Sequence, residues 1–177
     1  MAWLESLSLG LRRRLPVILQ TEAAECGLAC LAMVLGYHGV ITDLATLRAR
    51  HAISLKGITL SSLGKLAQEE KLGFRAVRLD LPELDKLRLP AILHWDLNHF
   101  VVLKAVSGNT ITVHDPDVGE RQFRLDEVSR LFTGVALELW PDPGFEPRKE
   151  KTVISLGQLI GQVSGFLPSL AQLLTLS

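Results

Sequence analysis

The stretch Gln20-Thr-Glu-Ala-Ala-Glu-Cys26-Gly-Leu-Ala-Cys30-Leu-Ala-Met-Val-Leu-Gly-Tyr37 brings together a carboxamide, a thiol and a helix-forming run. From Ala29 onward its small and apolar residues predict a buried helix, with Cys26 in the first turn. There the helix dipole and the unpaired backbone N–H groups favour the thiolate over the thiol. We therefore expect Cys26 to be a nucleophile, whereas Cys30, one turn deeper, lacks this benefit.

Gln20 lies six residues before Cys26. A bend before the helix would bring its side-chain amide beside the backbone N–H of Cys26. Two donors that converge on one point form an oxyanion hole, which stabilises the charge on a carbonyl oxygen under attack. The simpler interpretation is that a single cysteine at a helix start is a small buried hydrophobic residue. The motifs in the rest of the chain distinguish a catalytic cysteine from a buried hydrophobic one.

The composition predicts one domain with a tail, because 177 residues that are 47% hydrophobic can bury one ordinary core. Nineteen basic and nineteen acidic residues cancel, so we expect no nucleic-acid partner, and Arg12-Arg13-Arg14 is interpreted as a solvated or phospholipid-facing segment. Two cysteines four residues apart do not make a secreted disulfide framework, which favours a reducing compartment. Residues 1–7 lack a secretory signal pattern, so the domain is expected in the cytoplasm.

The first half of the chain after Tyr37 continues as helix. Thr42-Asp43 offers an N-cap for a short helix to about Arg50. Thr59 caps a second run, Leu60–Leu72, whose apolar residues recur on one helical face until Gly73 ends it.

The second half of the chain is predicted to form strands, with two short helices between them. The predicted strands are Phe74–Leu79, Pro90–Trp95, His99–Val106, Thr110–Asp115, Gly119–Phe123 and Gly134–Trp140, and the helices are Leu81–Leu87 and Leu125–Leu131. Pro141–Pro147 contains three prolines and a glycine, so the domain should end near residue 145.

The clearest hairpin joins the strand that begins at His99 to the strand that ends at Asp115. A three-residue loop, Ser107–Asn109, would place Val101 opposite Asp115 and His99 diagonal to it on the same face, within reach of a hydrogen bond. A two-residue loop would put the two side chains on opposite faces. The order Cys, His, carboxylate along the chain is typical of papain-like thiol proteases. His94 and His114 are interpreted as surface or structural residues.

The tail, Thr152–Ser177, has twenty-six residues without a charge and follows the basic run Arg148–Lys151. We interpret it as an interfacial helix to about Phe166, followed by the truncated start of a transmembrane helix, with its basic side in the cytoplasm. The alternative is an amphipathic helix packed on the domain or on a partner.

Three separated motifs, Gln20–Cys30, Ala91–Leu103 and His114–Gly119, closely resemble the N-terminal peptidase domain of bacteriocin-processing ABC transporters. These are the double-glycine leader peptidases, and the motifs look similar to those of the colicin V exporter type. Phe132–Leu139 extends the match, so the resemblance covers about residues 12–145.

The resemblance implies an α+β, papain-like fold in which an N-terminal helical half packs its nucleophile helix on an antiparallel sheet. It implies that Cys26 is the nucleophile, His99 the general base and acid, Asp115 the residue that orients His99, and Gln20 the oxyanion donor. Glu25 is a mild departure, since many relatives have Asp there. Cleavage after a Gly-Gly pair is expected, because a backbone without side chains can lie close to the thiol.

The family also implies partners and a setting. The substrate is a precursor peptide whose leader docks as an amphipathic helix. Residues 1–145 would form the peptidase domain and residues 146–177 the basic linker and membrane tail, followed by transmembrane and ATPase domains in a homodimeric transporter. We expect no cofactor in this domain, ATP and Mg²⁺ in the ATPase, and a place on the cytoplasmic face of the bacterial inner membrane.

Two other functions stay open. Exporters of the haemolysin type carry a degenerate form of this domain that lacks the nucleophile and holds unfolded substrate, although Cys26 argues against that reading. A metal site built from Cys26, Cys30 and histidines is the other, but no second compact ligand pair supports it.

Overall fold

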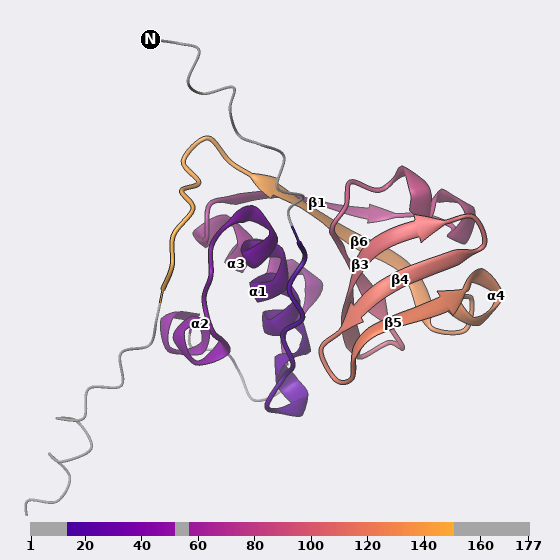
Figure 1. Cartoon of the computed structure of the whole chain (residues 1–177), viewed down its shortest axis with the longest axis horizontal. Coiled ribbons are helices and arrows are strands. Elements are labelled where there is room, and N and C mark those ends of the chain that lie inside the picture. Colours follow the sequence, from indigo (N-terminus) through magenta and orange to yellow (C-terminus); the bar gives the residue numbers. More distant parts are fainter. Residues whose placement is uncertain (1–13, 52–56, 151–177) are drawn as a thin grey trace, which may run out of the picture.

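The computed structural model describes residues 14–51 and 57–150 (Figure 1). The predicted tail from Thr152 onward, and Arg12 and Arg13 of the basic cluster, lie outside these residues and stay predictions. Among the helices that the structure describes, none has both the length and the apolar character needed to cross a bilayer.

The first half of the described chain is helical, as the sequence predicts. α1 (Cys26–His38) is entered through the short 3₁₀ helix η2 (Ala23–Glu25) and ends at Gly39, whose φ of 103° is the left-handed conformation common at helix ends. Every residue from Cys26 to Leu35 is buried. α1 therefore runs through the interior of the fold, where its small and apolar residues fit.

Two further helices, α2 (Leu44–His51) and α3 (Leu60–Glu69), pack beside α1 (Figure 1). Both begin at predicted caps: the side-chain oxygens of Asp43 and Thr59 each accept a backbone N–H three residues on, at 2.7 and 3.2 Å. α3 is shorter than predicted, because Lys71 takes a φ of 63° and turns the chain into the first strand.

The second half forms one sheet, and its strands follow the predicted order. They are β1 (Leu72–Arg78), β2 (Ala91–Trp95), β3 (His99–Ser107), β4 (Thr110–Asp115), β5 (Gly119–Arg124) and β6 (Phe132–Pro141). Their order across the sheet is β1-β6-β2-β3-β4-β5, and all neighbours are antiparallel. The short helices η3 (Leu81–Lys86) and α4 (Leu125–Val128) lie where the sequence predicts them. The fold is therefore α+β, with the helices on one antiparallel sheet.

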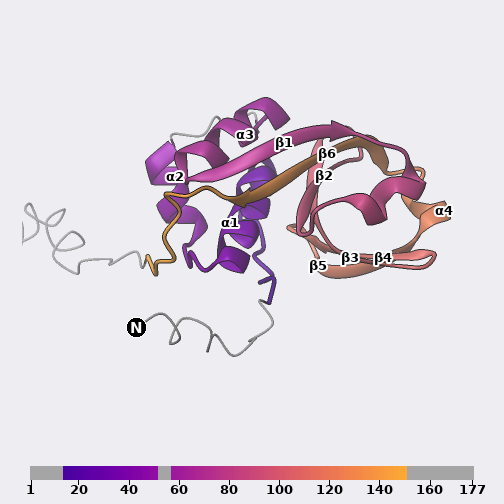
Figure 2. The same cartoon turned by 90° about the horizontal axis from the view of Figure 1, so that it is seen from above.

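Both faces of the central strands are buried. Ile92 and Val102 face the helical half and join a core that contains most of α1. Their neighbours Leu93 and Val101 face a second core, which η3 and α4 close. In Figure 2 the sheet is curled, with β1 and β6 on one side of the curl and β4 and β5 on the other. Successive residues of a strand point to opposite faces of the sheet, and here both faces are buried. Side chains on both faces must therefore be apolar, which explains the continuous apolar runs of β2 and β3.

The turn between β3 and β4 differs from the prediction. Ser107 lies opposite Thr110, so the loop has two residues rather than three. The register then shifts between Leu103 and Ala105, where β3 carries one extra residue, Lys104. This extra residue is a β-bulge, and it reverses the alternation of side chains along the strand.

The bulge adds one residue to β3, which compensates for the loop being one residue shorter than predicted. Val102 lies opposite His114, which is the pairing that a three-residue loop without a bulge predicts. His99 therefore lies diagonal to Asp115 on the same face of the sheet, although the turn at the other end of the hairpin is not the expected one.

After β6 the chain returns to the helical half over residues 145–150, which we call the exit segment. The carbonyl oxygen of Arg148 accepts a hydrogen bond from the N–H of Ile41 at 2.9 Å, and the N–H of Glu150 donates to the Ile41 carbonyl oxygen at 2.8 Å. These two bonds hold the exit segment beside the connection between α1 and α2.

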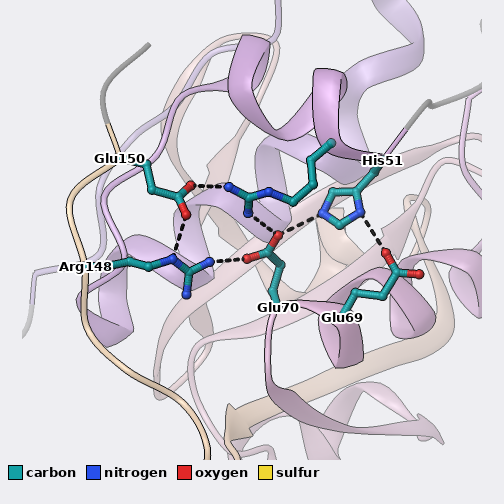
Figure 3. Close-up of polar contacts among 6 residues, drawn as sticks. His51, Glu69, Glu70, Arg148 and Glu150 are labelled. Atoms are coloured by element: carbon teal, nitrogen blue, oxygen red, sulfur yellow. Dashed lines mark hydrogen bonds and ion pairs between the residues drawn. The ribbon is translucent and has the colours of Figure 1, made fainter. Parts of the chain in front are cut away.

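A charged cluster around Glu70, at the end of α3, adds to this attachment (Figure 3). Glu70 is 2% exposed, and its carboxylate contacts Arg50 at 2.5 Å, His51 Nε2 at 2.8 Å and Arg148 at 2.7 Å. Both arginines also pair with Glu150, at 2.8 and 2.6 Å. The cluster thus joins α2, α3 and the exit segment.

Candidate active site

A cavity of about 540 Å³ lies at the start of α1, between the helical half and the sheet. Cys26 lines it. The other lining residues come from η2, from the segment before α3 and its first residue, and from the β2–β3 hairpin: Ala23, Ala24, Gly57, Ile58, Thr59, Leu60, His94, Leu97, Asn98 and Phe100. The volume is within the usual range for ligand sites, roughly 300–1,000 Å³. The thiol therefore borders a cleft between the two halves of the fold.

The side chains of His99 and Asp115 meet at the ends of two paired strands. His99 is the first residue of β3, and its Nε2 lies 2.8 Å from Oδ1 of Asp115, the last residue of β4. The backbone N–H of Asp117 donates to the same oxygen at 2.9 Å. His99 also forms a hydrogen bond with the side chain of Cys26. Because Nε2 contacts Asp115, the nitrogen available for this bond is Nδ1. The structure thus brings together three of the residues that the sequence selects.

The charges of this group follow from its contacts. The hydrogen bond with Asp115, and then that with Cys26, raise the pKa of His99 to about 9, against the opposing effect of burial. Burial raises the pKa of Asp115, but the hydrogen bonds from His99 and from the Asp117 N–H outweigh it and lower that pKa below its ordinary value. At neutral pH His99 is therefore cationic and Asp115 anionic. A cationic imidazole beside a thiol favours the thiolate.

Gln20 reaches the same site through the backbone. Its N–H donates to the carbonyl oxygen of Pro116, the residue after Asp115, at 2.8 Å. Its side-chain Oε1 is buried and has no hydrogen-bond partner within residues 14–51 and 57–150. A carboxamide with an unpaired end can turn its amide toward a ligand, since it offers both a donor and an acceptor.

The segment before Gln20 is held by His114. This buried imidazole lies 3.0 Å from the Pro16 carbonyl oxygen through Nδ1 and 2.9 Å from Glu120 through Nε2. His114 is therefore structural, as predicted. Its two contacts fix the chain that leads to Gln20 against the sheet.

Gly27 permits the close packing that forms one wall of the cleft. A Cβ at this position would lie 2.3 Å from Cγ2 of Ile58 and 3.4 Å from Cδ2 of Phe100. Both side chains line the cavity. Only glycine lets the segment before α3 approach the start of α1 this closely.

The second cysteine has no access to the cleft. Cys30 is fully buried, and burial raises the pKa of its thiol well above the ordinary value, with further contributions from Cys26 and Asp115. Both cysteines are free thiols. Cys30 is therefore a small core residue, and Cys26 is the thiol that borders the cavity.

Sequence reasoning missed the walls of the cleft. Ile58 and Leu97 lie in segments without a periodic pattern, and His94, which the sequence predicts to be a surface or structural residue, lines the cavity. The available signal was position: Leu97 and Asn98 fall between two predicted strands, directly before His99. Asp96 and Leu97 take left-handed φ values of 45° and 62° there, a backbone state that clusters at functional sites.

No group of three potential ligands among the described His, Cys, Asp and Glu residues is arranged to hold a metal ion. The arrangement instead offers a thiol, an imidazole that can donate or accept a proton, a carboxylate that holds the imidazole, and a carboxamide close by. These groups can carry out nucleophilic attack on a carbonyl carbon.

Comparisons with known proteins agree with this chemistry. The model of the peptidase C39 family matches residues 14–144. The colicin V secretion/processing ATP-binding protein CvaB of Escherichia coli is 47% identical over 171 residues, which are 97% of this chain and 24% of the relative. The chain thus spans about a quarter of the length of that relative.

Solved structures show the same fold. A double glycine motif protease from an AMS/PCAT transporter, crystallised with its leader peptide, is 37% identical with a TM-score of 0.68, over 73% of this chain and 94% of that one. The peptidase domain of Streptococcus ComA is 25% identical with a TM-score of 0.67, over 73% of this chain and all of that one. The chain belongs to the peptidase C39 family, whose members are cysteine peptidases with a papain-like fold.

Proposed function

We propose that this chain is the peptidase domain of a peptide-exporting ABC transporter and cleaves a bacteriocin-like precursor after a Gly-Gly pair. The observation that carries the proposal is the contact of His99 with both Asp115 and Cys26, at a cavity that Cys26 lines. The similarity to a double glycine motif protease that binds a leader peptide supports the choice of substrate.

Cys26 acts as the nucleophile of the first step. Its thiolate attacks the carbonyl carbon of the second glycine, and the carbonyl oxygen becomes an oxyanion. The Cys26 N–H and the Gln20 amide donate to this oxygen. The cationic His99 then gives its proton to the amine of the cargo peptide as the C–N bond breaks, which leaves the leader attached to Cys26 as a thioester.

His99 acts as the base of the second step. It takes a proton from a water molecule, which attacks the thioester and releases the leader with a carboxylate end. Asp115 keeps Nε2 of the imidazole occupied throughout, so Nδ1 faces the reacting atoms. The thiolate of Cys26 and the cationic His99 are then restored.

The domain needs no cofactor for these steps, and ATP and Mg²⁺ belong to the ATPase of the full transporter. We place the domain on the cytoplasmic face of the inner membrane, with the tail from residue 152 leading into the transmembrane part. The transporter works as a homodimer. The similarity to secretion/processing proteins about four times longer supports this setting.

The test is mass spectrometry of a synthetic precursor, with an amphipathic leader, a Gly-Gly pair and a short cargo, incubated with the chain under reducing conditions. Cys26→Ala is the matched control. Cleavage after the second glycine by the parent alone supports the proposal. Binding of the peptide without cleavage by either chain would replace it with the docking module of the haemolysin type.

A further inference from the structure

The loop between Gln20 and Cys26 buries no apolar side chain. Thr21, Glu22 and Ala23 are exposed, whereas α1 is buried from its first residue. A segment without buried apolar side chains depends on polar contacts for its conformation. The position of Cys26 is thus set by the core, but that of the Gln20 side chain depends on how this exposed loop is held.

One buried carboxylate holds the loop. Oε2 of Glu25 accepts hydrogen bonds from the N–H of Thr21 at 3.1 Å, from the Thr21 hydroxyl at 2.6 Å and from the N–H of Glu22 at 3.2 Å. Glu25 is 5% exposed. The N–H of Thr21 belongs to the same peptide group as the carbonyl of Gln20, so this bond sets the plane of the peptide that follows Gln20.

Arg48 of α2 holds the carboxylate in place. Its Nη2 forms an ion pair with Oε1 of Glu25 and donates to the Thr21 hydroxyl at 3.2 Å. Burial raises the pKa of Glu25, but the hydrogen bonds from Thr21 and Arg48 outweigh it and lower that pKa, so the group is ionised at neutral pH. A buried charge is kept only where such partners satisfy it.

Gln20 is thus fixed from both sides. Pro116 holds its own N–H, and Glu25 holds the N–H of the next residue. We propose that Glu25 is a positioning residue of the peptidase site, which keeps the Gln20 carboxamide aimed at the oxyanion through the loop while Arg48 anchors it. This inference rests on the proposed function, because it assigns Glu25 a part in the reaction proposed there.

The test separates loop geometry from thiol reactivity. Glu25→Gln keeps the size of the side chain but removes its charge, so we expect kcat for precursor cleavage to fall tenfold or more, with KM within about twofold. Alkylation of Cys26 by iodoacetamide should stay within about twofold of the parent, because it needs the pair with His99 and no oxyanion hole. A purely structural loss would lower both rates together.

Three further variants sharpen the result. Glu25→Asp retains the carboxylate and should recover most of the lost kcat, whereas Glu146→Gln, at an exposed glutamate of the exit segment, should change nothing. In a double-mutant cycle with Arg48→Met, the two losses should be less than additive, because both act on one loop. Unchanged kcat in Glu25→Gln, or equal losses in kcat and alkylation, would overturn the inference.

A failure of the proposed function can be distinguished from a failure of this inference about Glu25. If the parent itself does not cleave the precursor, the proposed function fails. Amide hydrogen exchange of Thr21 and Glu22 then still decides whether Glu25 holds the loop: faster exchange in Glu25→Gln than in Glu146→Gln supports it, and equal exchange refutes it.

Discussion

The backbone N–H of Gln20 donates to the carbonyl oxygen of Pro116, 2.8 Å away. Pro116 follows Asp115, which holds His99. The segment that carries the Gln20 carboxamide and the strand ends that carry His99 and Asp115 are therefore joined by a backbone hydrogen bond. Their relative position does not depend on the long path of chain between them.

Gln20→Ala should lower kcat by roughly 10²–10³, the usual cost of removing one oxyanion donor. The backbone bond to Pro116 does not involve the side chain, so the fold and KM should change little. Steady-state kinetics and circular dichroism check both expectations. A higher KM with an unchanged kcat would mean that Gln20 binds substrate instead.

Asp115→Asn should move the alkaline limb of the pH–rate profile. The bond to Asp115 is the largest cause that raises the His99 pKa from 6.5 to about 9, so without the charge this pKa falls and the imidazolium is lost at lower pH. We expect the limb to move down by about one to two units, with a lower maximum rate. An unmoved limb would mean that another group sets it.

The same contact affects stability. Because the folded-state pKa of His99 is raised, its protonated imidazole contributes to the free energy of unfolding. This contribution is complete below pH 6.5 and is lost as the pH rises through about 9. The stability difference between the parent and Asp115→Asn should therefore shrink over this interval. Urea unfolding at several pH values measures it.

Cys30→Ala should leave cleavage within about twofold of the parent and destabilise the fold modestly, since it removes one buried sulfur. In the folded parent, iodoacetamide should modify one thiol per chain, and peptide mapping should assign it to Cys26. In denaturant both thiols should react. Modification of Cys30 in the folded chain would contradict its burial.

Glu70→Gln should lower the free energy of unfolding by about 1–3 kcal/mol, because it removes the buried partner of two arginines. Burial raises the Glu70 pKa, but its ion pairs outweigh burial and lower it, so the difference should shrink as the pH falls below 4.5. Glu69→Gln is the matched control: its side chain is 61% exposed, and the change should stay within about 0.5 kcal/mol.

Local patterns were enough to predict the elements. The caps at Asp43 and Thr59 and the apolar run after Cys26 each depend on neighbours in sequence, and the structure contains all three. The register near His99 was right for a different reason. The number of residues between His99 and Asp115 limits the ways of pairing them, and a two-residue turn with a bulge uses the same number as a three-residue turn.

Contacts between distant segments could not be read in this way. The bond between Gln20 and Pro116 and the packing of Ile58 on Gly27 depend on how the helical half docks on the sheet. Neither leaves a periodic trace in the sequence. Glu25 is the clearest example, because a glutamate before a cysteine reveals nothing of Arg48, which lies on another helix.

The exit segment determines where tension on the chain would act. Glu150 is tied to Ile41 by its backbone and to Arg50 and Arg148 by its carboxylate. A pull on the polypeptide at this point would load α2 and α3 before it reached β6 and the strands that carry His99 and Asp115. Such a pull would thus act on α2, which carries the Arg48 that contacts Glu25, more directly than on the pair of His99 and Asp115.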